Sequence, residues 1–285
     1  MDLAALVTER ANPASAHIDK LSTAEMLRVM NEEDRKVADS VGLEIPRIAT
    51  AVDGIVDVFR KGGRLFYMGA GTSGRLGVLD AAECPPTFNV PADLVQGIIA
   101  GGDPALSRAT ETTEDDPAIG VRDLQARGFR ASDVLCGVAA SGRTPYVLGA
   151  IDEANRLGAL TIGISCTPDS ELARRARIAI TPVPGPEIIA GSTRLKAGTA
   201  TKLVLNMLTT GSFIRMGYVW GNLMVNVQPK NSKLLDRSKR IIAAATGVSY
   251  EEAGRMLAAA GNNVRHAITT WNEEQKDQRQ ENKNG

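Results

Sequence analysis

Short apolar runs alternate with helical patterns through the middle of the chain. Several runs lack the strict in–out alternation of a half-buried strand, which is typical of strands covered on both faces. The expected strands are Arg64–Ala70, Leu94–Ala100, Val134–Ala140, Leu160–Ser165 and Ile178–Val183. The expected helices between them are Ser73–Glu83, Pro104–Glu111, Ile119–Arg127, Pro145–Leu157 and Glu171–Ala176. This repetition predicts an α/β fold with a mostly parallel sheet sandwiched by helices.

Both ends of the chain have the polar, periodic character of helices. Ser22-Thr23-Ala24-Glu25 has the form of a capping box before an apolar helical run. A long helix is expected over about Thr193–Met216, followed by helices at Leu234–Thr246 and from Val248, and a helix–helix turn at Ala260–Asn263. The expected segments are a helical N-terminal segment at 1–53, a sheet domain at 54–228, a three-helix subdomain at 229–272 and a tail at 273–285. The tail is rich in Gln, Glu, Lys and Asn, which predicts fraying or disorder.

Composition and charge do not favour a nucleic-acid or membrane partner. Lys plus Arg and Asp plus Glu are equal at 33 each, so the formal net charge is zero. The N-terminus lacks the basic region and long apolar core of a signal peptide. The most apolar run, Leu203–Ile214, is too short and too polar to span a bilayer. We therefore expect a cytoplasmic protein that binds neither nucleic acid nor a membrane.

Cysteine and histidine usage narrows the possible chemistry. The three cysteines, Cys84, Cys136 and Cys166, are widely spaced and form no CxxC pair, which argues against a disulfide framework or a zinc site. His17 and His266 are the only histidines, so the chain has few histidines from which to build a histidine metal site or a Ser-His-Asp triad. Acid–base chemistry would therefore depend on carboxylates, and we expect no metal and no organic cofactor.

Two expected strands end in turns that combine glycine with hydroxyl side chains. They are Gly69–Gly74 and Ala139–Pro145, and each leads into an expected helix. Glycine allows close approach of a ligand, and the N–H groups at a helix start favour an anion. Ligands of open α/β sheets gather at this carboxyl edge. The turns therefore predict a phosphorylated small-molecule ligand, and the candidate contacts are Gly71, Thr72, Ser73, Ser141, Gly142, Arg143 and Thr144.

The same turns also have a simpler interpretation, in which glycine only allows the chain to reverse. Neither turn is a P-loop, because no Lys-Ser/Thr follows the glycines. Gly69, Gly71 and Gly74 match the GxGxxG spacing, but the acidic residue expected about 20 positions later is not evident. The glycines alone are therefore weak evidence for a nucleotide.

Longer motifs give a specific resemblance. The stretch Gly185–Lys202 resembles the signature shared by the glucokinase regulatory protein family and the bacterial N-acetylmuramic acid 6-phosphate etherases. The two turns resemble those of the sugar isomerase (SIS) fold, which binds phosphosugars. Further stretches similar to the etherases are Asn12–Ser15, Leu21–Thr23, Gly69–Pro86, Ala139–Tyr146 and Gly221–Val225. Together they extend over roughly residues 8–270.

The resemblance implies a lyase that recycles peptidoglycan sugar. The family reaction removes D-lactate from N-acetylmuramic acid 6-phosphate and leaves N-acetylglucosamine 6-phosphate. Opening the sugar ring gives a C1 aldehyde, which acidifies the C2 proton. A base can then take that proton while an acid protonates the departing C3 oxygen, and water adds at C3. This elimination and hydration needs a proton acceptor and a proton donor but no cofactor.

The resemblance makes Glu83 the proton donor to the lactyl oxygen and Glu114 the second catalytic carboxylate, which we assign as the C2 base. Glu83 lies ten residues after Ser73, about 15 Å along an ideal helix, so it could reach the far end of an extended sugar phosphate. By itself Glu83 could equally be an ordinary helix-terminal residue, with Pro85-Pro86 ending the helix. Only the family pattern selects Glu114 from the other acidic residues of its loop, which are Glu111, Asp115 and Asp116.

Three residues near the start of the long helix complete the predicted site. Arg194 and Lys196 could contact the phosphate or the lactyl carboxylate, and Ser192 is grouped with them. The alternative for the two cations is an ion pair on a helix or at a subunit interface. Phosphosugar binders of this fold are commonly dimers, so the resemblance implies a homodimer in which this segment reaches the neighbouring site.

Two other functions fit the same motifs. A non-catalytic phosphosugar sensor would bind without turnover and would be indifferent to the loss of Glu83. An aldose–ketose isomerase would use a similar base but would convert substrates that have no lactyl group.

Overall fold

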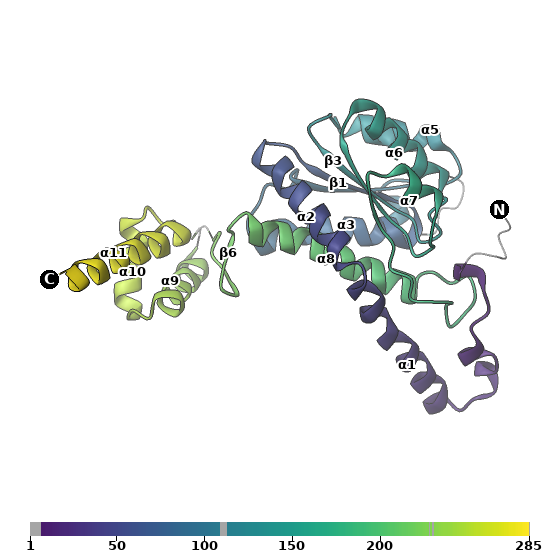
Figure 1. Cartoon of the computed structure of the whole chain (residues 1–285), viewed down its shortest axis with the longest axis horizontal. Coiled ribbons are helices and arrows are strands. Elements are labelled where there is room, and N and C mark those ends of the chain that lie inside the picture. Colours follow the sequence, from purple (N-terminus) through teal and green to yellow (C-terminus); the bar gives the residue numbers. More distant parts are fainter. Residues whose placement is uncertain (1–6, 109–112, 228, 230, 285) are drawn as a thin grey trace. The chain divides into compact units, whose positions relative to one another are not determined.

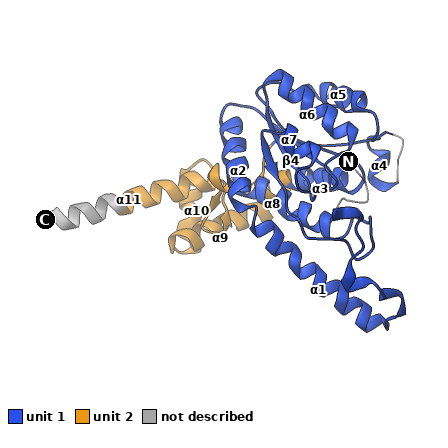
Figure 2. Cartoon of the chain, turned by 45° about the vertical axis from the view of Figure 1, so that its right-hand side comes forward, with its two compact units in different colours: residues 1–83, 91–212 blue, residues 84–90, 213–285 orange. Residues whose placement is uncertain are grey.

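The computed structural model describes residues 7–108, 113–227, 229 and 231–284, with side chains described as far as residue 275. The chain divides into two compact units, at 1–83 with 91–212 and at 84–90 with 213–285 (Figure 2). Helices α3 (Gly71–Phe88) and α8 (Lys196–Arg215) contribute residues to both units. The units divide the chain at other places than the four expected segments, and those segment boundaries stay predictions.

A five-stranded parallel sheet forms the centre of the first unit (Figure 1). Its order is β2 (Val95–Ile99), β1 (Leu65–Gly69), β3 (Val134–Val138), β4 (Leu160–Ile164) and β5 (Ile178–Ile180). Every residue of β1 and β3 is buried, which accounts for their unbroken apolar runs. The predicted α/β fold with a parallel sheet is confirmed.

Helices cover both faces of the sheet. Phe66 and Met68 of β1 join one core cluster with α6 (Pro145–Leu157), beside α5 (Pro117–Ala126) and α7 (Glu171–Arg175). Tyr67 points to the opposite face, where it lies against Gly77 of α3 and its hydroxyl donates to the Leu205 carbonyl of α8 (3.4 Å). Figure 1 shows α2 (Ile45–Arg60) with α3 and α8 on that second side. The described part of the sheet region also contains the short helix α4 (Pro104–Ser107).

The prediction that Pro85 and Pro86 end α3 is wrong, because the helix continues to Phe88. A proline costs one intrahelical donor, but its fixed φ is compatible with a helix. Cys84 and Phe88 are buried at helical spacing, and this packing favours continuation. The helix ends instead at Asn89, which has a φ of +51° and donates its N–H to the Pro85 carbonyl (2.8 Å).

From residue 7 on, the N-terminal segment is helical, as expected. Short 3₁₀ turns at Val7–Glu9, Pro13–Ser15 and Ile18–Lys20 precede α1 (Thr23–Gly42). Both bonds of the capping box are present, because Ser22 accepts from the Glu25 N–H and the Glu25 carboxylate accepts from the Ser22 N–H.

The second unit contains the three expected helices, α9 (Ser232–Thr246), α10 (Tyr250–Ala259) and α11 (Val264–Asn284). They bury an apolar cluster of their own together with residues around β7 (Leu223–Met224), which pairs antiparallel with β6 (Val219–Trp220). The tail expected to fray from residue 273 is part of α11 as far as Asn284. Glu, Gln and Lys are good helix formers, and no Gly or Pro interrupts this stretch.

The three cysteines, all among the described residues, form no disulfide and are buried. Burial, with the nearby Glu187 carboxylate, raises the pKa of Cys166 to about 12, and burial also raises the pKa of Cys136. Within the described ranges, no helix is both long and apolar enough to cross a bilayer. The same part of the chain holds no group of three or more acidic, His or Cys side chains suited to a metal ion.

Candidate active site

A cleft of about 290 Å³ lies where β1 and β3 end, at the carboxyl edge of the sheet. It brings together the two glycine–hydroxyl turns, a loop before α5, the N-terminal segment and the start of α8. The lining residues are Glu9, Ala70, Gly71, Thr72, Ser73, Glu114, Val138, Ala139, Ala140, Ser141, Thr144, Gly191, Thr193, Gly198 and Thr201. The location is the one that parallel α/β sheets use for ligands.

The first turn joins β1 directly to α3. Gly69 and Gly74 pack face to face, and a Cβ on Gly74 would lie 2.6 Å from the Gly69 carbonyl oxygen. Gly71 has a φ of +51°, in the left-handed region that favours glycine. This tight join places Thr72 and Ser73 at the first turn of α3, where N–H groups lack intrahelical acceptors and the helix dipole favours an anion.

The second turn joins β3 to α6 and presents Ser141 and Thr144 to the same cleft. Gly142 has a φ of +65°, and a Cβ there would lie 2.3 Å from the Ser170 Oγ. Gly142 therefore shapes the turn without lining the cleft. Arg143 does not line the cleft either. Its Nη1 is buried and has no hydrogen-bond partner among the described residues.

Glu114 lies in the cleft and is half-buried. Its carbonyl accepts a hydrogen bond from the Tyr146 N–H (3.0 Å), which fastens this loop to the first turn of α6. Asp115 and Asp116 are exposed and do not line the cleft, and Asp116 caps α5 by accepting from the Ala118 N–H (2.8 Å). Glu111 lies outside the described residues. Of the three acidic side chains described here, the structure places only Glu114 in the cleft.

Glu83 is exposed on α3 and does not line the cleft. The helix carries it about 15 Å from Ser73 along its axis, as the spacing predicts. A single chain therefore does not bring the two predicted catalytic carboxylates into one cavity.

Lys196 is completely buried and does not line the cleft. Its ammonium lies 2.7 Å from the Glu33 Oε2 and donates to the Pro184 carbonyl (3.1 Å). Glu33 also accepts from the Asn12 Nδ2 (3.0 Å) and from Lys36. The ion-pair alternative for Lys196 is therefore the arrangement that the fold contains.

The other two residues predicted near the start of α8 also lie outside the cleft lining. Arg194 is exposed, and Ser192 is half-buried and donates its N–H to the Ile189 carbonyl (3.0 Å).

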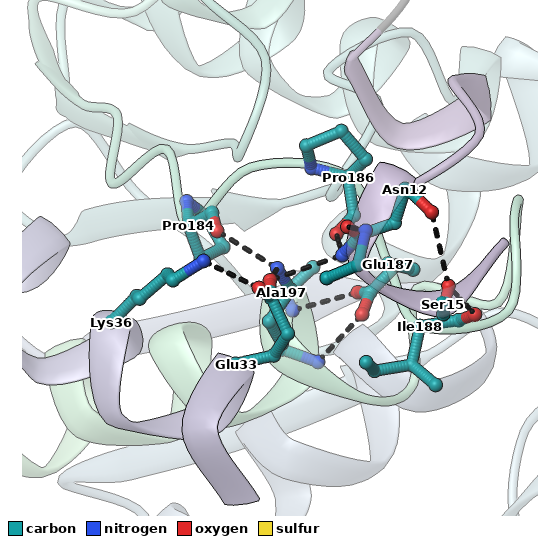
Figure 3. Close-up of polar contacts among 11 residues, drawn as sticks. Asn12, Ser15, Glu33, Lys36, Pro184, Pro186, Glu187, Ile188 and Ala197 are labelled. Carbon is teal, nitrogen blue, oxygen red and sulfur yellow. Dashed lines mark hydrogen bonds and ion pairs between the residues drawn. The ribbon is translucent and has the colours of Figure 1, made fainter. Parts of the chain in front are cut away.

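Glu187 has a role that no sequence pattern indicated. Its buried carboxylate accepts from the N–H groups of Lys196 and Ala197, at 2.9 Å each (Figure 3). A carboxylate at a helix start satisfies two orphan donors and complements the helix dipole. The cap thereby fixes the start of α8, from which Gly198 and Thr201 reach the cleft.

Glu9 is a further cleft residue that the sequence analysis missed. Among the described residues of the lining, the two charged side chains are Glu9 and Glu114. A bound phosphate would therefore be held in this chain by hydroxyls and backbone N–H groups rather than by a lysine or arginine of the described lining.

Comparison with known proteins identifies the relatives of this chain. Residues 47–155 match the family model of the glucokinase regulatory protein N-terminal SIS domain, and residues 112–211 match that of the SIS domain. A Bacteroides fragilis NCTC 9343 structure described as a candidate phosphosugar isomerase involved in capsule formation is similar in fold. Its TM-score is 0.52 and its identity 22%, over 69% of this chain and 94% of that one.

Curated relatives are much more similar in sequence. The N-acetylmuramic acid 6-phosphate etherase of Vibrio vulnificus (strain YJ016) is 56% identical over 268 residues, which are 94% of this chain and 89% of that protein. The etherase of Yersinia pestis (strain Pestoides F) is also 56% identical, over 94% of this chain and 91% of its own length. The chain therefore belongs to the family of the N-acetylmuramic acid 6-phosphate etherases.

Proposed function

We propose that this chain cleaves the D-lactyl ether of N-acetylmuramic acid 6-phosphate by elimination and hydration. The products are N-acetylglucosamine 6-phosphate and D-lactate, as in the recycling of cell-wall sugar in the cytoplasm. The observation that carries the proposal is the cleft that joins Glu114 to the two hydroxyl-bearing helix starts, in a chain of the etherase family.

Different groups of the protein would act on different parts of the substrate. The phosphate binds at the starts of α3 and α6, where Thr72, Ser73, Ser141 and Thr144 add hydroxyl donors to the N–H groups. Once the ring is open, Glu114 takes the C2 proton and the C3–O bond breaks. Glu83 donates a proton to the departing lactyl oxygen, and water then adds to the unsaturated aldehyde at C3.

We infer that the working enzyme is a homodimer with shared sites. Glu83 is exposed and lies outside the cleft, so a second copy could bring its own Glu83 to the cleft that holds Glu114. The substrate also carries a lactyl carboxylate, while the charged lining of the described cleft is acidic. The exposed Arg194 of a second copy is suited to pair with that carboxylate.

The test is turnover of N-acetylmuramic acid 6-phosphate in ¹⁸O-water by the wild type and by Glu83→Gln, followed by mass spectrometry. We expect lactate release with the label in the sugar product, and a loss of at least about 100-fold in the variant. Because Glu83 is exposed, the variant should keep the melting temperature of the wild type. Lactate release with the label in lactate would contradict the elimination route. No release by a folded protein that binds phosphosugars would favour a sensor.

A further inference from the structure

Glu9 belongs to the N-terminal segment, far in sequence from both glycine–hydroxyl turns, yet it lines the cleft beside them. Its carboxylate is exposed to solvent and accepts a hydrogen bond from the Thr8 hydroxyl at 3.4 Å. An exposed carboxylate in the wall of a substrate cleft is accessible to a bound sugar.

Hydrogen bonds fasten the segment around Glu9 to the loop before α8. The Thr8 carbonyl accepts from the Gly191 N–H (3.0 Å), and the Asn12 Nδ2 donates to the Pro186 carbonyl (3.0 Å). The Ser15 hydroxyl donates to the Ile188 carbonyl (2.7 Å), as Figure 3 shows. These contacts lie on both sides of Glu9 along the chain, so its backbone has a fixed position beside the cleft.

Two further contacts fix the surroundings of Glu9: one beside its carboxylate and one that anchors its segment. Gly191 has a φ of +76°, and a Cβ on it would lie only 3.1 Å from the Glu9 Oε2. Glycine at this position therefore leaves room for the carboxylate. Asn12 also donates to Glu33, so the segment is tied to the buried ion pair of Lys196.

The proposed reaction requires one proton transfer that Glu83 and Glu114 do not cover. Before C2 becomes acidic, the ring must open, which takes a proton from the C1 hydroxyl and gives one to the ring oxygen. Of the residues that the structure describes, neither His17 nor His266 lines the cleft. Glu9 is the other carboxylate in the described lining.

We propose that Glu9 opens the sugar ring of the bound substrate, an inference that rests on the proposed function. The Glu9 carboxylate accepts the proton of the C1 hydroxyl while the C1–O5 bond breaks and the C1 carbonyl forms. The same proton then passes to O5, so no oxidant, reductant or further reactant is consumed. A carboxylate is suited to this transfer because its two oxygens can face the two oxygens of one carbon.

The test measures ring opening apart from the elimination. Exchange between the two anomers of N-acetylglucosamine 6-phosphate is followed by NMR exchange spectroscopy, with saturating sugar phosphate and the spontaneous rate subtracted. Glu114→Gln serves as the parent, because the C2 base is then absent. Adding Glu9→Gln should slow the catalysed exchange by about 100-fold. The dissociation constant for N-acetylglucosamine 6-phosphate, from calorimetry, should stay that of the parent.

Asp19→Asn is the matched control, because Asp19 is an exposed carboxylate of the same segment that does not line the cleft. It should leave anomer exchange unchanged. Exchange that persists after Glu9→Gln overturns the proposal, and so does a loss explained entirely by weaker binding. The same holds if the parent does not accelerate exchange. None of these results bears on lactate release by the wild type. The proposed function is therefore decided separately, by the lactate-release experiment.

Discussion

At the scale of single residues, the acidic loop before α5 separates structural from chemical carboxylates. The Asp116 side chain caps the N-terminus of α5, and Asp115 is exposed to solvent. Glu114 instead lies in the cleft, with its carbonyl held by the Tyr146 N–H. The backbone bond fixes the position of Glu114 at the cleft.

The buried ion pair makes a prediction about acid stability. Burial alone would raise the pKa of Glu33, but hydrogen bonds from Lys196, Lys36 and Asn12 outweigh it and lower the pKa to about 2, from an ordinary 4.5. Because the folded pKa lies below the unfolded one, the carboxylate stabilises the fold above about pH 4.5. This contribution is lost as the pH falls from 4.5 towards 2.

Glu33→Gln should therefore lower the free energy of unfolding at pH 7 by about 3 kcal/mol, because Lys196 then stays buried without its counter-charge. Urea unfolding at pH 7 and pH 3 measures the effect, and the difference between variant and wild type should shrink at the lower pH. Asp19→Asn, at an exposed carboxylate, is the control. A variant as stable as the wild type at pH 7 would show that the pair contributes no net stability.

At this scale, sequence reasoning predicted only part of the cleft lining. The hydroxyls of both turns were predicted because they follow apolar strands directly, and Glu114 was selected by a family motif. The role of Lys196 could not be decided, because its partner Glu33 is remote in sequence and the burial of both follows from tertiary packing. Glu9 was missed because the turns around it carry no periodic pattern.

At the scale of elements, α5 and α6 pack so closely that backbone touches backbone. A Cβ on Gly120 would lie 2.0 Å from the Tyr146 carbonyl oxygen, and one on Gly149 would lie 2.4 Å from that of Pro117. Tyr146 also holds Glu114, so the packing of these two helices sets the position of a predicted catalytic residue.

Gly120→Ala should destabilise the protein by about 2 kcal/mol, because backbone cannot move aside as a flexible side chain can. It should also lower kcat, because Tyr146 and the attached Glu114 loop must shift. Thermal unfolding and lactate release measure the two effects. Gly42→Ala is the control, since a Cβ there would meet nothing within 4 Å apart from neighbouring residues of its own helix. It should be neutral or stabilising by less than about 1 kcal/mol. Equal stability of the two variants would mean that α5 and α6 accommodate the added Cβ without a loss in the free energy of unfolding.

The sequence located the elements well where burial and periodicity agree. All five expected strands are present, though β5 ends at Ile180 rather than Val183. The end of α3 was predicted too early, because the effect of proline was judged from the local sequence alone. The buried residues Cys84 and Phe88 lie on either side of the prolines, and their packing favours a continuous helix.

At the scale of the whole molecule, the proposed shared site predicts complementation. If each site takes Glu83 from one chain and Glu114 from the other, a dimer of Glu83→Gln with Glu114→Gln has one intact and one doubly impaired site. Equal mixing of two inactive variants, with subunit exchange, should then restore about a quarter of the wild-type activity.

Sedimentation measures the oligomeric state, and lactate release before and after subunit exchange measures the recovery. Mixing each variant with itself is the control. Continued inactivity in a mixture that contains mixed dimers would mean that both carboxylates of a site come from one chain. The sequence predicted sharing only through family resemblance, because no single-chain pattern encodes a partner.

The buried cysteines give the folded chain a property of practical use. All three thiols are buried, and burial raises the pKa of Cys136 and Cys166, so labelling must wait for local opening. Cys136 and Cys166 lie in the first unit and Cys84 in the second. The alkylation rate of each cysteine can be measured separately by peptide mapping. The rates of Cys136 and Cys166 therefore report the opening of the first unit, and that of Cys84 the opening of the second, in the unaltered protein.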